Sequence, residues 1–283
     1  MPAARRGVPK SRASSTKNAR TKEAREAPLD VRADDVTIVV EDMAQFDEPI
    51  NICVYGPSGV GKTVLAGGAP RSTFLTTEKG LASAKRSGSA SRIMRAYDWE
   101  HILAGIRKAD DTLGKDDWLI VDSGTKMQVL YMRWILRMEN RANSSRSLDI
   151  PAIHNHQQYQ NGFKRFCDHI IDAPYNSIFV FGEMEIPGED DEMEKVPHIE
   201  GGRTFQVCRY IIGQFDVGIR YTISRSLSEP GHTVRLALTQ PTENCWAKDR
   251  YMALGEWQTV EPREFDAMAQ FIDLIENPED DAS

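Results

Sequence analysis

An eight-residue segment rich in glycine has the residue types of a phosphate-binding loop. It reads Gly56-Pro-Ser-Gly-Val-Gly-Lys-Thr63 and follows the apolar, β-branched stretch 50–55. Glycine allows the backbone to turn tightly and to point its N–H groups inward at a phosphate. A lysine and a hydroxyl at the end of such a loop bind the β- and γ-phosphates and Mg²⁺. We therefore expect ATP and Mg²⁺ as cofactors, bound by Gly56, Pro57, Ser58, Gly59, Val60, Gly61, Lys62 and Thr63.

A second apolar segment ends in the carboxylate that a phosphate loop requires. Trp118-Leu-Ile-Val-Asp122 has the composition of a buried strand and lies 59 residues after Thr63, which leaves room for a helix, a strand and a helix. Carboxylate and hydroxyl oxygens are ligands that Mg²⁺ prefers. We predict that Thr63 and Asp122 form the metal site, with Lys62 beside them. The alternative is that Asp122 only caps the end of its strand.

The segments around these motifs alternate between strand-like and helix-like patterns. Apolar, β-branched runs predict strands, and apolar positions spaced three and four apart predict helices. The strands are expected at 50–55, 72–78, 118–122 and 175–183, and the helices from Asp98, at 124–141 and at 151–172. Two further strands, 217–224 and 233–239, are joined through 229–232 and predict an antiparallel hairpin. The alternation predicts an α/β fold with a mainly parallel sheet flanked by helices.

Composition and charge divide the chain into three parts. Of its 283 residues 40% are hydrophobic, and no apolar run approaches the roughly 18 residues of a membrane span, so no membrane partner is expected. The first 30 residues carry 8 Lys or Arg against 3 acids and have no aromatic residue. We expect a disordered basic arm over 1–34, a folded domain over 35–275 and an acidic tail over 276–283. The arm either contacts nucleic-acid phosphates or only solubilises the chain.

Taken in order, the motifs resemble a known family. A strand ends in Thr-Thr-Glu78-Lys-Gly-Leu81, the next motif reads Leu-Ile-Val-Asp122-Ser, and Trp246-Ala-Lys-Asp-Arg-Tyr251 follows the hairpin. Over residues 49–275 this sequence resembles phage-encoded RecA-like P-loop ATPases of the Sak single-strand-annealing type. The resemblance implies that 35–275 is a RecA-like ATPase domain with a C-terminal antiparallel hairpin.

The resemblance also implies roles for individual residues. Glu78 would act as the general base that polarises the attacking water. Glu183 or Glu185, after the strand at 175–183, would sense the γ-phosphate, where the family usually has an amide or a hydroxyl. Lys248 and Arg250 would form a finger that reaches the nucleotide of a neighbouring subunit. The expected catalytic residues are thus Lys62, Glu78, Asp122, Glu183, Lys248 and Arg250.

The function implied by the resemblance is Mg²⁺-dependent ATP hydrolysis on single-stranded DNA during recombination or annealing. The expected partners are single-stranded DNA, further copies of the chain in a ring or filament, and a single-strand-binding protein. The expected location is the cytoplasm, of a host cell if a phage encodes the chain, and four cysteines far apart in the sequence fit that reducing compartment. Three alternatives stay open: a helicase- or loader-type replication ATPase, a small-molecule phosphotransferase, and a nucleotide-binding module without turnover.

One stretch conflicts with the implied DNA binding. RecA-like proteins hold single-stranded DNA on the loop that corresponds to 184–203. Here residues 183–200 contain eight acids and a single lysine, Lys195. Such a surface repels phosphates. Either DNA is bound elsewhere, or the acidic loop is displaced by a partner or by DNA, or the chain does not bind DNA tightly by itself.

Overall fold

The computed structural model describes residues 42–43, 48–188, 192–201, 206–225, 233–260 and 266–277. The chain divides into two units, 1–47 and 48–283, and every helix and strand named below belongs to the second. The expected arm over 1–34, the turn at 229–232 and the tail residues 278–283 lie outside the described residues.

Strands that follow one another along the chain do not lie in chain order in the sheet. The main sheet of the described residues has nine strands in the order β11-β9-β8-β1-β5-β4-β2-β3, with β10 beside β8. Their bounds are β1 Asn51–Tyr55, β2 Ser72–Thr76, β3 Arg92–Arg95, β4 Trp118–Asp122, β5 Asn176–Val180, β8 Val217–Arg225, β9 Thr233–Leu238, β10 Lys248–Asp249 and β11 Trp257–Val260. The pairs from β3 through β1 to β8 are parallel, whereas β8, β9 and β11 pair antiparallel. The predicted α/β fold with a C-terminal antiparallel hairpin is confirmed.

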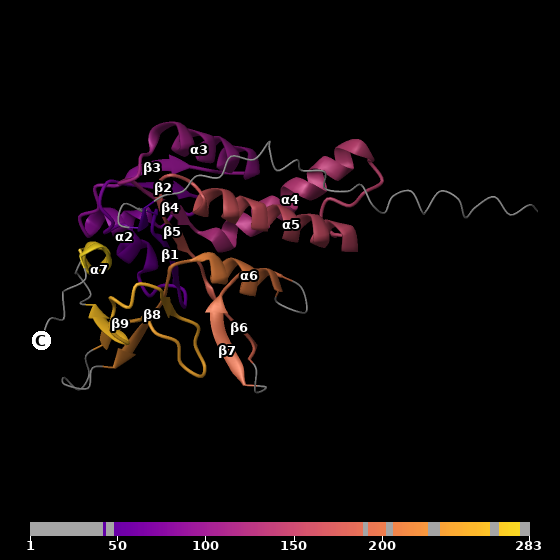
Figure 1. Ribbon diagram of the computed structural model, residues 1–283. Coiled ribbons are helices and arrows are strands. Elements are labelled where there is room, and N and C mark those ends of the chain that lie inside the picture. Colours follow the sequence, from indigo (N-terminus) through magenta and orange to yellow (C-terminus); the bar gives the residue numbers. More distant parts are fainter. Residues whose placement is uncertain are drawn as a thin grey trace, which may run out of the picture. The chain divides into compact units, whose positions relative to one another are not determined.

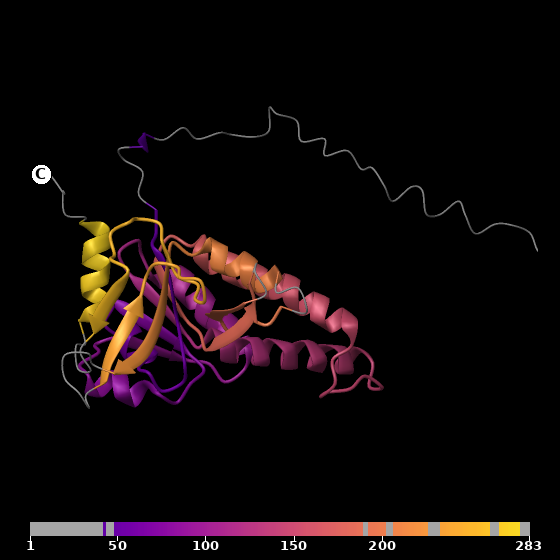
Figure 2. The same ribbon diagram turned by 90° about the horizontal axis from the view of Figure 1, so that it is seen from below.

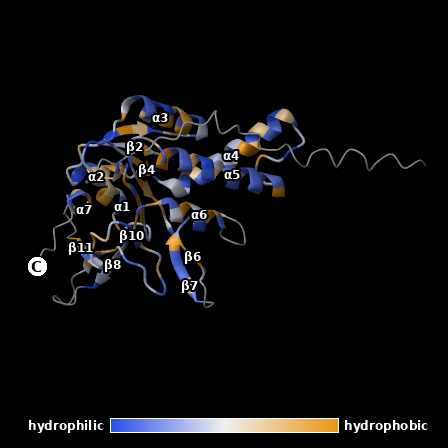
Figure 3. Cartoon of the chain, viewed as in Figure 1, coloured by the Kyte–Doolittle hydropathy of each residue, from blue (hydrophilic) through white to orange (hydrophobic). Residues whose placement is uncertain are grey.

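Seven helices of the described residues cover the two faces of this sheet (Figures 1 and 2). They are α1 Lys62–Ala66, α2 Leu81–Arg86, α3 Trp99–Thr112, α4 Gly124–Ala142, α5 Ile153–Ile171, α6 Gln206–Gln214 and α7 Ala267–Glu276. Alternate residues of each central strand enter opposite cores, as the pleat of a strand requires. One core joins the sheet to α3, α4, α5 and α6, and the other joins it to α1, α2 and α7. Figure 3 shows the central strands as predominantly hydrophobic and the outer helix faces as hydrophilic.

The residues after β5 depart from the sequence prediction. The single strand expected over 175–183 was wrong, because β5 ends at Val180 and a second strand, β6 (Glu183–Pro187), begins after Phe181 and Gly182. The backbone N–H of Gly182 donates to the Thr125 hydroxyl, and its carbonyl accepts from the N–H of His198. At Gly182, these two hydrogen bonds take the place of backbone hydrogen bonds to a neighbouring strand of the main sheet. Strand β6 pairs instead with β7 (Met193–Pro197) in a separate hairpin that extends away from the main sheet (Figure 1).

No helix in the described part of the chain is both long and apolar enough to cross a lipid bilayer.

Candidate nucleotide site

The glycine-rich segment forms a turn between β1 and α1 that presses against β8. Gly56, Gly59 and Gly61 have φ values of 150°, 82° and 103°, which residues with a side chain rarely adopt. A Cβ atom on Gly56 would collide with the backbone carbonyl of Tyr221 on β8. Glycine at this position therefore lets the loop pack closely on the neighbouring strand and fixes where the loop lies.

Lys62 opens α1, and its ammonium group folds back over the loop. Its Nζ atom donates to the carbonyl oxygens of Gly56 at 2.8 Å and Pro57 at 2.7 Å. Burial lowers the pKa of Lys62, and the negative charges of Asp122 and Glu183 oppose that shift. The cation is thus held at the mouth of the turn, where phosphate oxygens could replace the two carbonyls.

Thr63 and Asp122 meet although they are distant in the sequence. The Thr63 hydroxyl donates to Oδ2 of Asp122 at 3.0 Å, at the carboxyl end of β4. Burial raises the pKa of Asp122 to about 6, and the charge of Glu78 adds to the shift, whereas the Thr63 bond and Lys62 oppose it. A buried carboxylate beside a hydroxyl is a pair of hard oxygen donors. Mg²⁺ uses one or two such ligands and completes its shell with phosphate oxygens and water, so these residues fit Mg²⁺.

Glu78 lies beside Asp122 because β2 and β4 are parallel neighbours in register. Thr76 is opposite Asp122, so both strands end at the same edge of the sheet. The Ser123 hydroxyl donates to Oε1 of Glu78 at 3.0 Å, and the Ser123 hydroxyl oxygen itself accepts from the backbone N–H of Lys126 in the first turn of α4. Ser123 thus fixes the exposed carboxylate of Glu78 next to the phosphate loop. The sequence showed Ser123 only as the residue after Asp122.

Glu183 also enters the site, but Arg220 already binds its carboxylate. Arg220 Nε donates to Glu183 Oε2 at 2.7 Å, and the two side chains are only 11% and 15% exposed. Arg220 is paired in register with Tyr55, immediately before the loop. This bond to Glu183 raises the pKa of Arg220 despite its burial. Glu185 lies two residues further along β6, opposite Lys195.

Lys248 and Arg250 lie away from their own phosphate loop. Lys248 pairs with Gly218 at the amino end of β8, and its Nζ donates to the carbonyl of Gly213 at 2.9 Å. Arg250 forms an ion pair with Asp216 at 2.6 Å, and about half of its side chain is exposed. The loop follows the carboxyl end of β1, so both cations are at the opposite end of the strands. A role on a neighbouring subunit's nucleotide stays a prediction.

Two further residues, which the sequence did not single out, contact the site. Arg235 on β9 donates from Nε to the carbonyl of Val60 at 2.9 Å and lies against Gly61. The hydroxyl of Tyr55 donates to the carbonyl of Lys195 at 2.9 Å and connects the last residue of β1 to β7. For Arg235, the sequence did offer a signal, because this residue is the single cation in the otherwise uncharged strand 233–238.

The described groups combine the parts of a nucleoside-triphosphate site. Lys62 and the loop offer phosphate contacts, Thr63 and Asp122 offer metal ligands, and Glu78 offers a base at the same edge of the sheet. Such an arrangement can bind a triphosphate with Mg²⁺ and orient a water molecule toward it.

Among the comparisons with known proteins, the match to a family model agrees with this geometry. No curated protein matches the chain. Among solved structures, the flagellar accessory protein FlaH from Methanocaldococcus jannaschii is 14% identical, with 76% of this chain and 86% of that chain covered at a TM-score of 0.37. The family model described as AAA domain matches residues 48–251, which include the phosphate loop, Asp122 and Arg250. The chain therefore belongs to the AAA domain family and is a P-loop ATPase by fold.

Proposed function

We propose that this chain is a Mg²⁺-dependent, RecA-like ATPase that acts on single-stranded DNA in recombination or annealing, as phage-encoded proteins of the Sak type do. The observation that carries the proposal is the hydrogen bond of 3.0 Å between Thr63 and Asp122, with Glu78 held beside it by Ser123. The family match supports an ATPase domain, and the Thr-Glu-x-Gly-Leu and Ala-Lys-Asp-Arg motifs support the finer, RecA-like assignment.

Each residue has a defined task in this proposal. The loop N–H groups and Lys62 bind the β- and γ-phosphates, and Thr63 and Asp122 hold Mg²⁺, which supplies positive charge to the phosphate oxygens when bound. Glu78 orients a water molecule and accepts its proton. The Ser123 hydroxyl keeps Glu78 turned toward the loop. Glu183 borders the γ-phosphate side, where its charge reaches Lys62.

The positions of Lys248 and Arg250 are compatible with the proposed oligomer. Because they lie at the opposite end of the strands from their own loop, any action on a nucleotide would be on that of another subunit. We therefore include a ring or filament in the proposal, with a single-strand-binding protein as a further partner in the cytoplasm. The ATPase rate per subunit should rise with protein concentration. A rate that stays constant on dilution would remove the role in trans.

The decisive experiment measures ATP hydrolysis with and without single-stranded DNA, alongside the Lys62→Ala variant. We expect DNA to stimulate hydrolysis and Lys62→Ala to abolish nucleotide binding or turnover. Stimulation by a small metabolite instead of DNA would favour a phosphotransferase, and strand unwinding would favour a helicase. Equal hydrolysis by wild type and Lys62→Ala would exclude the mechanism.

A further inference from the structure

One segment of this acidic chain is free of acids and rich in cations. Residues 79–97 contain five Lys or Arg and no Asp or Glu, whereas residues 31–283 as a whole carry 27 basic and 39 acidic residues. The segment runs from the residue after Glu78 through α2 and β3. The five cations are Lys79, Lys85, Arg86, Arg92 and Arg95.

The structure leaves these five cations in solvent. All five residues are exposed, and within the described residues none donates a hydrogen bond or forms an ion pair from its side chain. Two cations on neighbouring elements are engaged: Arg71 pairs with Asp116, and Arg137 pairs with Glu100. A group of unpaired cations on an acidic protein is available to a polyanion.

An apolar hollow separates the cations of α2 from those of β3. Its volume is about 310 Å³, and its walls include Phe74, Leu81 and Lys85. Ile93 lines it from β3 although its side chain is 51% exposed, and Arg95 lies on the same face of β3 because side chains alternate along a strand. Apolar surface between cations suits the alternating bases and phosphates of an unpaired strand.

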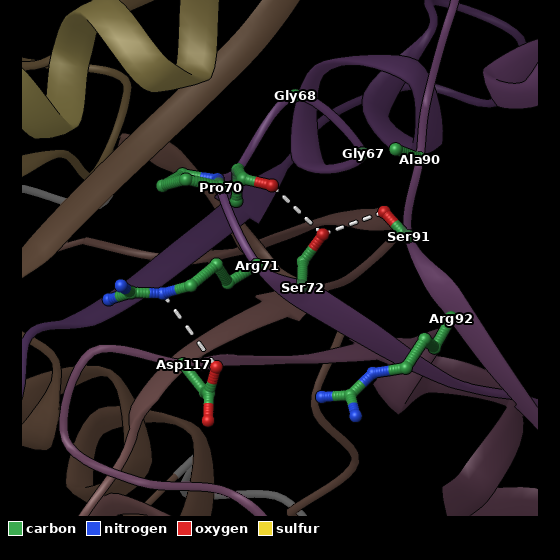
Figure 4. A pocket seen from close by; sticks show the side chains of 10 residues that line it. Gly67, Gly68, Pro70, Arg71, Ser72, Ala90, Ser91, Arg92 and Asp117 are labelled. Atoms are coloured by element: carbon green, nitrogen blue, oxygen red, sulfur yellow. Dashed lines mark hydrogen bonds and ion pairs between the residues drawn. The ribbon is translucent and has the colours of Figure 1, made fainter.

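Exposed aromatic and cationic side chains also lie at the two ends of β3. Tyr97, just after β3, is 71% exposed and rests edge-on against His101 at 5.6 Å between ring centroids. At the start of β3, Arg92 lies on the other side of this outermost strand, where it borders a second hollow of about 520 Å³ (Figure 4). There Arg71 turns to Asp117, whereas Arg92 has no such bond. An exposed aromatic ring beside unpaired cations provides stacking as well as charge.

The neighbouring acids do not neutralise the face. Asp98 accepts from the backbone N–H and the ring of His101, and Glu100 is within 3.8 Å of Arg137. Asp116 and Asp117 face Arg71. The β3 strand is at the end of the main sheet, and no described strand pairs with its outer edge. The face therefore combines positive charge, apolar surface and free access.

We propose that the α2–β3 face, comprising residues 79–97, binds single-stranded nucleic acid. This proposal rests on the proposed function and assigns its DNA-binding surface, which the acidic stretch 183–200 could not provide. It also connects the surface to catalysis. Lys79 directly follows Glu78, so a strand bound to the face contacts the segment that carries the base.

The test is a salt titration of the affinity of the full chain for a fluorescent oligothymidylate, measured by anisotropy. Each phosphate contact contributes about 0.7 to the slope of log K against log salt for single strands. Replacing Lys85, Arg86, Arg92 and Arg95 by Ala should therefore reduce the slope by about 2.8. The matched control replaces Arg107, Lys108, Arg141 and Arg146 by Ala, which removes the same charge from exposed positions elsewhere. The control should retain the wild-type slope.

Three results separate the possibilities. An unchanged slope in the α2–β3 variant, with binding intact in the wild type, overturns the surface but leaves the ATPase proposal standing. A wild type that binds no oligothymidylate refutes both the surface and the DNA role. If the α2–β3 variant sediments as a monomer where the wild type is an oligomer, and its DNA binding is lost with the oligomer, then the face binds a second copy of the chain. That result overturns the proposal. Unchanged ATP binding in both variants confirms that they are folded.

Discussion

The ion pair between Arg220 and Glu183 allows a quantitative test of the site. Its side chains are 11% and 15% exposed, so removing Arg220 leaves a carboxylate with little access to water. Breaking a fully buried pair destabilises a protein by about 3–5 kcal/mol, and the residual exposure here lowers the expectation to about 2–4 kcal/mol. For a domain of this size about 3 kcal/mol corresponds to a fall in Tm of roughly 6–12 °C. The change to make is Arg220→Met, which keeps the length and apolar stem of the side chain.

A double-mutant cycle separates the charge from the packing. Glu183→Gln leaves Arg220 without its carboxylate and should also destabilise the protein. The double variant Arg220→Met, Glu183→Gln has no charge left at either position of the pair and should recover much of the loss, with a coupling energy of about 1–3 kcal/mol. The control is Arg225→Met at the exposed end of the same strand, which should change stability by less than about 0.5 kcal/mol.

The assay is urea and thermal unfolding of the four variants and the wild type without nucleotide. Equal, small shifts in Arg220→Met and Arg225→Met would refute the reasoning, because they would show that the burial of the pair has no energetic consequence. Additive losses in the double variant would show that the two side chains act independently.

Two further predictions concern the other carboxylates. Because the pKa of Asp122 in the folded chain is about 6, above its ordinary 3.8, ionisation reduces stability as the pH rises through this interval. Asp122→Asn should therefore be about as stable as wild type near pH 4 and more stable by about 3 kcal/mol above pH 7 without Mg²⁺, as measured by urea unfolding. A difference that does not change with pH would contradict this. Ser123→Ala should lower kcat about tenfold with unchanged ATP affinity, because Glu78 loses its hydroxyl donor. Ser123→Thr should restore activity, and a loss of ATP affinity in Ser123→Ala would point to a structural role instead.

Features encoded in a short stretch of chain were predictable from the sequence. The phosphate loop and the strand that ends in Asp122 each need only local residue types, and parallel pairing then brings their ends together. The same holds for the start of α3, where Asp98 accepts from the N–H of His101 as a helix cap. Local patterns predict these elements because the turn, the apolar run and the helix cap are each specified by residue types a few positions apart.

Features that depend on contacts between distant residues were not predictable. Arg220 and Glu183 are 37 positions apart, and Arg235 is 175 positions from Val60. The sequence indicated a carboxylate at 183 as a phosphate sensor, but it carried no sign of the arginine opposite. The strand order that sets β8 beside β1 decides these contacts, and that order is a property of the whole sheet.

The cations around the loop bear directly on how turnover is controlled. Lys62 is bonded to loop carbonyls, Arg235 to Val60 and Arg220 to Glu183, so these three cations already have a partner in their own chain. Lys248 and Arg250 lie at the far end of the strands. In the proposed mechanism, additional positive charge for the transition state comes either from within the chain, by a rearrangement of side-chain bonds, or from a second subunit. Dilution of the protein distinguishes the two sources, because only the second depends on concentration.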